Sequence, residues 1–390
     1  MLLNLLRSGA KAPGEQKSSA VGGLVAFQGG NRPAWSSRNP AALTRVGYQN
    51  NAVVFRCVRM IAESAAATPL ELRVGGALMT EHPALTLLAS PHAGQDGAGL
   101  LETIYGHLML FGDAYLEAAA LDAGGAPAEL HALRPDRMRI APGPDGWPEA
   151  YEYEVGGRRH RFDMTTEAQP ILHLRGYHPQ DDHYGLAPLQ AAAAAIDIHN
   201  AAGAWSKGLL DNAARPSGAI VYGGAEGETL SDEQFKRISD ELTLSHQGAR
   251  NAGRPMLLEG GLDWKPMGFS PSDMEFLKTK ESAAREIALA FGVPPQLLGL
   301  PGDNTYSNYQ EANRAFYRQT ILPLSRRVGA ALAGWLGWRW GETLSLAPDL
   351  EAVPALQAER EAQWRRISTA DFLDEDEKRA MLGLPPRAAR

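Results

Sequence analysis

A loop near the middle of the sequence gathers four side chains that could bind a metal ion. His178, Asp181, Asp182 and His183 follow one another closely, and imidazole and carboxylate groups are accepted ligands of zinc. The segment lacks the helical spacing of histidines found in zinc sites on helices. We therefore interpret it as a solvated turn ahead of a helix, and we predict neither a metal site nor a bound cofactor.

No other part of the sequence has the spacing of a catalytic site. A phosphate-binding loop needs glycines that aim backbone N–H groups at the ligand, and the nearest match, Ser206-Lys207-Gly208, falls inside a predicted helix. Cys57 lies at helical spacing among apolar residues and is predicted to be buried. The acidic run from Asp374 suits a helix start, where the backbone dipole favours negative charge. We predict no catalytic residue and no enzyme.

Length and composition are those of an ordinary folded protein. The chain has 390 residues, of which 44% are hydrophobic and 21% charged, as in globular proteins. Its net charge of −7 means that contact with nucleic acid cannot depend on a strongly basic surface. One cysteine excludes a disulfide framework and suits a reducing cytoplasm. No uncharged apolar run approaches the roughly 20 residues of a membrane span, so we expect no membrane partner.

Hydrophobic periodicity predicts both helices and strands in the first half of the chain. Residues 8–45 are rich in glycine, serine, alanine, asparagine and proline without an apolar period, so we expect a flexible N-terminal arm over residues 1–45. Apolar residues recur every three or four positions over 54–65 and 101–111, which indicates two amphipathic helices. We expect a short strand at 70–74, and a period of two predicts further strands at 115–119, 129–133, 138–141, 151–155, 159–162 and 171–174. We expect a mixed sheet packed on helices.

The second half contains longer helices with recognisable starts. A helix over 186–213 has Pro188 in its first turn, and Ser231 with Gln234 forms a capping box for another helix. The strands expected around this second helix are 218–222, 256–259 and 262–267, the last two joined by Gly260-Gly261. A short α/β module therefore follows the helix that starts at Pro188.

Another long helix, from Ser272 to Phe291, is only weakly amphipathic. Its polar residues outnumber its apolar ones, so most of its circumference is exposed unless identical copies pack around it. The last long helix covers 309–338, and Pro323 should bend it or interrupt its hydrogen-bond ladder. A strand at 343–346 and two short helices complete the chain.

Several segments, in this order, resemble landmarks of the portal proteins of HK97-like tailed phages. They are 51–64, 69–72, 82–88, 111–115, 133–137, 184–189, 286–299, 305–308 and 370–386. The most specific is Glu286-Ile-Ala-Leu-Ala-Phe-Gly-Val-Pro-Pro-Gln-Leu-Leu-Gly299. The resemblance spans about residues 47–386, nearly the whole chain.

This resemblance implies an α+β portal-protein fold with a wing of helices and a mixed sheet, a two-helix stem, a small α/β clip and a short helical crown. The implied divisions are arm 1–45, wing 46–185, stem helix 186–213, clip 214–270, stem helix 271–292, tunnel loop 293–308, long bent helix 309–340 returning through the wing, and wing edge with crown 341–390.

The resemblance also implies a function. About twelve copies would form a ring at one capsid vertex, assembled in the bacterial cytoplasm, through which DNA is packaged and ejected. The implied partners are double-stranded DNA bound without sequence specificity, the terminase motor, a head–tail adaptor and the major capsid protein. The particle could be a phage, a defective prophage or a gene transfer agent.

The candidate functional residues fall into three groups. The expected tunnel-loop contacts with DNA are Asp303, Asn304, Thr305 and Tyr306. The expected stem residues are Lys278, Lys280, Glu281 and Arg285, whose cations either touch phosphates or pair with Glu281 and acidic groups of neighbouring copies. The expected partner-binding residues of the clip are Phe235, Arg237, Glu241 and Trp264.

Two other functions compete with this interpretation. The chain could be a different structural protein of the particle head. It could also be a hydrolase that uses the polar loop at 302–308, but that loop contains no histidine, lysine or cysteine to activate a nucleophile.

Overall fold

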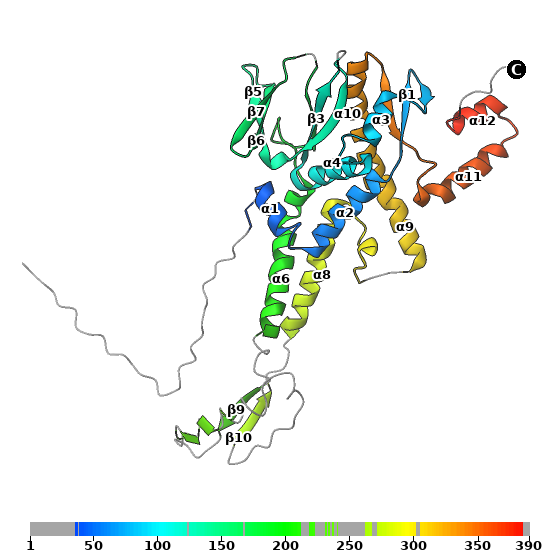
Figure 1. Cartoon of the computed structure of the whole chain (residues 1–390). Coiled ribbons are helices and arrows are strands. Elements are labelled where there is room, and N and C mark those ends of the chain that lie inside the picture. Colours follow the sequence, from blue (N-terminus) through cyan, green and yellow to red (C-terminus); the bar gives the residue numbers. More distant parts are fainter. Residues whose placement is uncertain are drawn as a thin grey trace, which may run out of the picture. The chain divides into compact units, whose positions relative to one another are not determined.

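The computed structural model describes residues 36–37, 39–122, 125–166, 168–211, 218–222, 262–266, 271–301 and 305–384, with positions 231, 233, 234, 236, 237 and 240 (Figure 1). Helices and strands contribute to one main cluster of buried apolar side chains. Within these residues no helix is long and apolar enough to cross a membrane. The expected α+β class is confirmed.

Two helices form the centre of the core. Helix α2 (Ala52–Ala66) is capped by Asn51, whose side-chain oxygen accepts the backbone N–H groups of Val53 and Val54. The predicted apolar stripe of α2 is buried, and α2 packs on α4 (Gly97–Phe111). Helix α4 ends at Gly112, whose φ of +78° suits glycine, and the chain continues directly into a strand.

The described strands near these helices form three sheets of three strands each. The first has the order β4 (Pro127–Leu133), β3 (Asp113–Leu121), β8 (Ile171–Arg175). The second has the order β5 (Met138–Pro142), β6 (Pro148–Val155), β7 (Arg158–Asp163). The third has the order β11 (Leu344–Pro348), β1 (Leu70–Val74), β2 (Ala77–Met79).

The expected mixed sheet was wrong in one respect: every pairing among the described strands is antiparallel. Short turns join β1 to β2, β3 to β4, β5 to β6 and β6 to β7. Such turns reverse the chain, whereas a parallel neighbour needs a crossover of a dozen or more residues. The sheets therefore form from local hairpins, to which β8 and β11 are added from farther along the chain.

Helix α1 (Pro40–Val46) corrects the expectation of a flexible arm over residues 1–45. The side chain of Asn39 accepts the N–H of Ala41 at 2.9 Å and Pro40 occupies the first turn, which are both favourable at a helix start. Leu43 is completely buried and fixes the helix to the core. Another short helix, α3 (Pro83–Ala89), is capped by the imidazole of His82.

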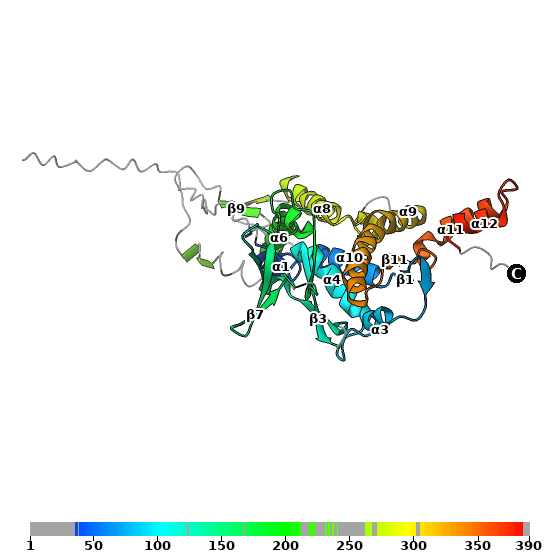
Figure 2. The ribbon, with the colours of Figure 1, turned by 90° about the horizontal axis from the view of Figure 1, so that it is seen from above.

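Helices α6 (Ala193–Asp211) and α8 (Pro271–Phe291) lie side by side in both views (Figure 1, Figure 2). The first was predicted as one helix over 186–213, but Ala192 separates α6 from the single turn α5 (Pro188–Ala191). Pro188 does begin that turn, as expected. The second helix has the predicted extent.

The last long helix is interrupted, as predicted from Pro323. It consists of α9 (Tyr306–Phe316), a π-helical turn (Tyr317–Ile321) and α10 (Leu322–Trp340). Pro323 has no N–H to donate to the carbonyl four residues earlier, and the wider turn accommodates this break in the ladder.

The remaining elements are short. Strands β9 (Gly218–Tyr222) and β10 (Leu262–Pro266) pair with each other, whereas the strand predicted over 256–259 lies outside the described residues. In the described part of the chain, 3-10 turns cover Pro135–Arg137, Pro295–Leu298 and Pro354–Leu356. Helices α11 (Gln357–Ser368) and α12 (Glu375–Met381) complete the described chain, and α12 begins with a capping box formed by Asp374 and Glu377.

Candidate functional site

The contact between α6 and α8 uses only one face of α8. Buried side chains of that face are Ala283, Ala284, Ile287, Ala288 and Phe291. Nearer the start of α8, the ring of Phe276 stacks on Trp205 of α6, with 4.3 Å between ring centroids and 14° between planes. The opposite face, which includes Lys278, Arg285 and Leu289, is exposed.

One of the four predicted stem residues differs from the other three in its solvent exposure. Lys278, Glu281 and Arg285 are exposed, but Lys280 is half-buried. The Nζ atom of Lys280 lies 3.9 Å from the point that a Cβ on Gly203 of α6 would occupy. Lys280 is therefore directed toward α6, and only the other three remain candidates for the exposed surface.

The ammonium group of Lys280 also affects a histidine of α6. Burial lowers the pKa of His199, and the positive charge of Lys280 lowers it further. The Nδ1 atom of His199 is 3.0 Å from the side-chain nitrogen of Asn51, the cap of α2. Neutral His199 thus belongs to a polar network that joins α6 to the core, and the half-buried ammonium group of Lys280 lies close enough to affect it.

Arg285 has a structural contact besides its exposed charge. Its guanidinium donates a hydrogen bond to the backbone carbonyl of Pro301, in the later part of the segment that joins α8 to α9. At the other end of this segment, the hydroxyl of Thr320 donates to the carbonyl of Gly292 at 2.6 Å. Gly292 ends α8 with a φ of +67°. The Arg285 hydrogen bond holds the connection between α8 and α9 against α8, and the Thr320 hydrogen bond holds the turn that follows α9 against the end of α8.

The predicted tunnel loop, residues 293–308, is shorter than expected. Thr305 caps α9, because its hydroxyl oxygen accepts the N–H of Asn308 at 3.2 Å. Tyr306 is consequently the first residue of α9, whereas we had expected the helix to begin at Tyr309. Asp303 and Asn304 lie outside the described residues.

Two tyrosines dominate the exposed start of α9. Tyr306 is 78% exposed and its hydroxyl accepts a hydrogen bond from Gln310 at 3.0 Å. Tyr309 is 51% exposed and lies one turn further along, on the same side of the helix. Neither Tyr309 nor Thr320 was among the residues predicted for this region. The cap at Thr305 could have indicated the former, but no local signal pointed to the latter.

The predicted clip residues are only partly described. Trp264 of β10 pairs with Ile220 of β9, and Arg237 is exposed. The capping box is confirmed, since Gln234 donates its N–H to the hydroxyl of Ser231 at 3.2 Å and accepts the N–H of Ser231 at 2.9 Å. Phe235 and Glu241 lie outside the described residues. The four residues therefore stay a predicted surface.

The loop of histidines and aspartates forms a turn. The carboxylate of Asp181 accepts the N–H groups of His183 and Tyr184 at 2.8 and 2.9 Å, and these hydrogen bonds lower its pKa. In the part of the chain that the structure describes, no group of three or more His, Cys, Asp or Glu side chains is arranged to hold a metal ion.

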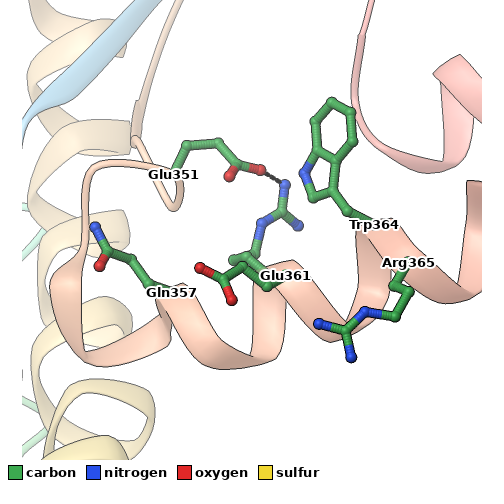
Figure 3. Close-up of a pocket in the computed structure, with 6 residues that line it drawn as sticks. Glu351, Gln357, Glu361, Trp364 and Arg365 are labelled. Carbon is green, nitrogen blue, oxygen red and sulfur yellow. Dashed lines mark ion pairs between the residues drawn. The ribbon is translucent and has the colours of Figure 1, made fainter.

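A surface hollow of about 620 Å³ lies beside the start of α11 (Figure 3). Its lining residues are Glu351, Gln357, Arg360, Glu361, Trp364 and Arg365. The carboxylate of Glu351 forms an ion pair with Arg360. None of the lining side chains carries a hydroxyl, thiol or imidazole group.

The arrangement of an antiparallel wing, a helix pair and a capped connecting segment agrees with one protein family. Residues 52–383 match the profile of the phage portal protein family. The match covers most of the 390 residues, and the chain belongs to this family.

Relatives within the family refine the comparison. A structure from the neck of an empty gene transfer agent particle, solved with C6 symmetry, is 59% identical, with 92% of this chain and 97% of that chain covered and a TM-score of 0.78. A structure from the neck of a native particle, solved with C12 symmetry, is also 59% identical, with the same coverage and a TM-score of 0.76. The portal protein of Enterobacteria phage HK97 is 24% identical over 292 residues, 73% of this chain and 66% of that protein. The resemblance to HK97-like portal proteins is confirmed.

Proposed function

We propose that twelve copies of this chain form a ring at one vertex of a capsid, and that double-stranded DNA passes through the ring during packaging and ejection. The main support for the proposal is that the two faces of α8 lie in different environments. One face is buried on α6 within the chain, while Leu289 on the other face is 79% exposed. Burial of this apolar side chain against a neighbouring copy would be favourable. The C12 symmetry of the native gene transfer agent neck supports the number of copies.

DNA must slide through such a ring. Each phosphate neutralised by lysine or arginine adds salt-dependent affinity, which opposes sliding, and the net charge of −7 limits that affinity. We infer that Thr305, Tyr306 and Tyr309, with Asp303 and Asn304, make weak and replaceable contacts with the DNA backbone, without reading the bases. Lys278 and Arg285 either reach phosphates or pair with acidic groups of neighbouring copies.

The other partners are assigned by position along the chain. We infer that residues 214–270, with Phe235, Arg237, Glu241 and Trp264, bind the packaging motor and later the head–tail adaptor. Residues 46–185 would contact the major capsid protein, and the ring would assemble in the bacterial cytoplasm before the capsid is filled.

Electron microscopy of the purified full-length chain tests the proposal. End-on images should show rings of twelve subunits with a central hole, and mass measurement should give roughly 500 kDa for closed rings of the 42.0 kDa chain. Assemblies without a hole would favour another structural protein of the head. A stable monomer that turns over a substrate would favour the hydrolase and contradict the portal proposal.

A further inference from the structure

A second hollow, of about 480 Å³, lies between α10 and the edge strand β8, away from the α6–α8 pair. Trp335 and Trp338 of α10 and Leu172 of β8 provide apolar walls, and Arg339 also lines the hollow. We call it the Arg339 hollow. Its volume is within the range of sites that hold small ligands or a few side chains of a partner.

Arg339 is the unusual member of this group, because it is only 7% exposed. Its guanidinium lies over the ring of Trp335, 5.1 Å from the centroid. It donates hydrogen bonds to the backbone carbonyls of Gly125 and Gln169, at 3.2 and 2.7 Å. Burial lowers the pKa of this guanidinium. Among the residues that the structure describes, no carboxylate forms an ion pair with Arg339.

A buried cation without a counter-charge is unfavourable, and arginine is rarely buried unless it is paired. Carbonyl dipoles and the Trp335 ring offset part of the lost hydration. The guanidinium has five N–H donors, and the two hydrogen bonds to Gly125 and Gln169 use only some of them. A negatively charged group that enters the hollow would supply the missing counter-charge.

Access to the hollow is open at one point of α10. A Cβ atom added to Gly334, which also lines the hollow, would meet nothing within 4 Å. A slender side chain can therefore enter beside the tryptophans. A DNA phosphate is a poor candidate, because duplex binding depends on several exposed cations rather than one buried guanidinium. A carboxylate at the end of a short apolar stem fits better, since arginine and carboxylate form planar, two-pronged pairs.

We propose that the Arg339 hollow binds an acidic peptide segment of a partner protein, with one carboxylate on Arg339 and an adjacent apolar side chain against Trp335 and Trp338. This site is separate from the surface assigned to DNA, so its failure would leave the ring proposal untouched. It would give the chain an anchoring point for another component of the particle.

Two labelled peptides test the proposal on the full-length protein. The first has the sequence Gly-Ser-Leu-Glu-Leu-Ser-Gly and the second has glutamine in place of glutamate, with binding followed by fluorescence anisotropy at low salt. The glutamate peptide should bind at least about tenfold more tightly, the discrimination expected for one buried ion pair. Arg339→Gln should abolish this preference.

A second variant keeps the test independent of the folding of Arg339→Gln. Gly334→Leu should fill the entrance and weaken binding of the glutamate peptide at least about tenfold. Gly106→Leu is the matched control, because a Cβ on Gly106 of α4 also meets nothing within 4 Å, and it should leave binding unchanged.

The proposal would be overturned by equal binding of the two peptides, by a glutamate preference that survives Arg339→Gln, or by binding unaffected by Gly334→Leu. Glu167, outside the described residues, lies two positions before Gln169. Tighter peptide binding by Glu167→Gln would mean that this chain supplies its own carboxylate, and would exclude a partner as the occupant.

Discussion

The imidazole of His173 and the carboxylate of Asp113 lie 2.8 Å apart, Nε2 to Oδ1, and both side chains are more than nine-tenths buried. The same carboxylate oxygen accepts the N–H of Gly185 at 2.9 Å, and the other ring nitrogen of His173 is 3.1 Å from the hydroxyl of Tyr151. One carboxylate thereby joins β3 and β8 to β6 of the second sheet and to the turn that precedes α5.

Asp113→Ala should lower the free energy of unfolding by about 2–4 kcal/mol, because His173 and the Gly185 N–H would lose a buried acceptor. Glu129→Ala is the control. Its carboxylate pairs with His131 on the surface, where such pairs contribute about 0–1 kcal/mol. Urea unfolding of both variants measures the difference. Equal losses would show that the Asp113 network contributes no more than a surface pair.

Gly185→Ala should prevent stable folding. A Cβ at Gly185 would lie 2.1 Å from the carbonyl oxygen of Gly112 and 2.5 Å from the nitrogen of Gly176, and these are backbone atoms that cannot turn away. Gly106→Ala, in an open position of α4, should instead gain about 0.5–1 kcal/mol of helix stability. Thermal unfolding compares the two. A Gly185→Ala protein as stable as the unaltered chain would contradict the close approach.

Stability should fall between pH 6.5 and pH 4 because of His107. Burial lowers the pKa of His107 to about 4, with Asp136 raising it and Arg134 lowering it by smaller amounts. The neutral ring is favoured in the folded chain, so the unfolded chain binds the proton first as the pH falls below 6.5. The loss should approach about 3 kcal/mol near pH 4 and should be absent above pH 7.

His107→Phe tests the source of this pH dependence. Phenylalanine preserves an aromatic ring opposite Phe111, which lies 6.1 Å away centroid to centroid, and it cannot be protonated. Urea unfolding from pH 4 to pH 7 should show a smaller decline for the variant. If the free energy of unfolding declined equally in the variant and the unaltered chain, other groups would be the cause of the pH dependence.

Leu289→Glu should block ring formation without unfolding the subunit. Leu289 is exposed within one chain, so the substitution should change monomer stability by less than about 0.5 kcal/mol. A new carboxylate in a subunit contact would be unfavourable. Mass photometry measures assembly, with Leu121→Glu, at another exposed leucine, as control. Normal rings from Leu289→Glu would remove α8 from the proposed contact.

The double variant Tyr306→Ala with Tyr309→Ala should form rings but reduce the DNA retained per particle severalfold, since both exposed rings at the start of α9 would be lost. Tyr306→Phe with Tyr309→Phe keeps the rings and removes the hydroxyls, which separates aromatic from polar contacts. Quantification of protected DNA in purified particles measures the effect. Full retention by the alanine variant would place the DNA contact elsewhere.

Local features of the fold could be predicted because their causes lie within a few residues. The reciprocal hydrogen bonds of Ser231 and Gln234 follow from their spacing alone. Pro323 lacks an N–H wherever the rest of the chain lies, and the helix is interrupted beside it. Asn39 and Pro40 carried the same kind of signal for α1, but it was hidden by the polar composition around it.

Long-range relationships had no such local cause. Leu72 pairs with Leu346, and Asp113 meets His173 across two strands, through contacts that form only when distant segments pack. The orientation of the side chains in the candidate site could not be predicted either, because it also depends on packing between distant segments. The side chain of Lys280 has the charge of its exposed neighbours, but it is directed toward α6 because Gly203 leaves space there. The sequence shows that Lys280 is positively charged, but it does not show toward which element its side chain points.

The π-helical turn at Tyr317–Ile321 determines how far α9 is rotated about its own axis relative to α10. Each residue of an α-helix advances about 100° around the axis, and a π turn absorbs one residue more than an α-helical turn. Removing a single residue from this turn would rotate Tyr306 and Tyr309 about the helix axis by about a quarter of a revolution. The direction in which the two tyrosine side chains point is therefore determined at the C-terminal end of α9. Deletion of one residue there would rotate both side chains together.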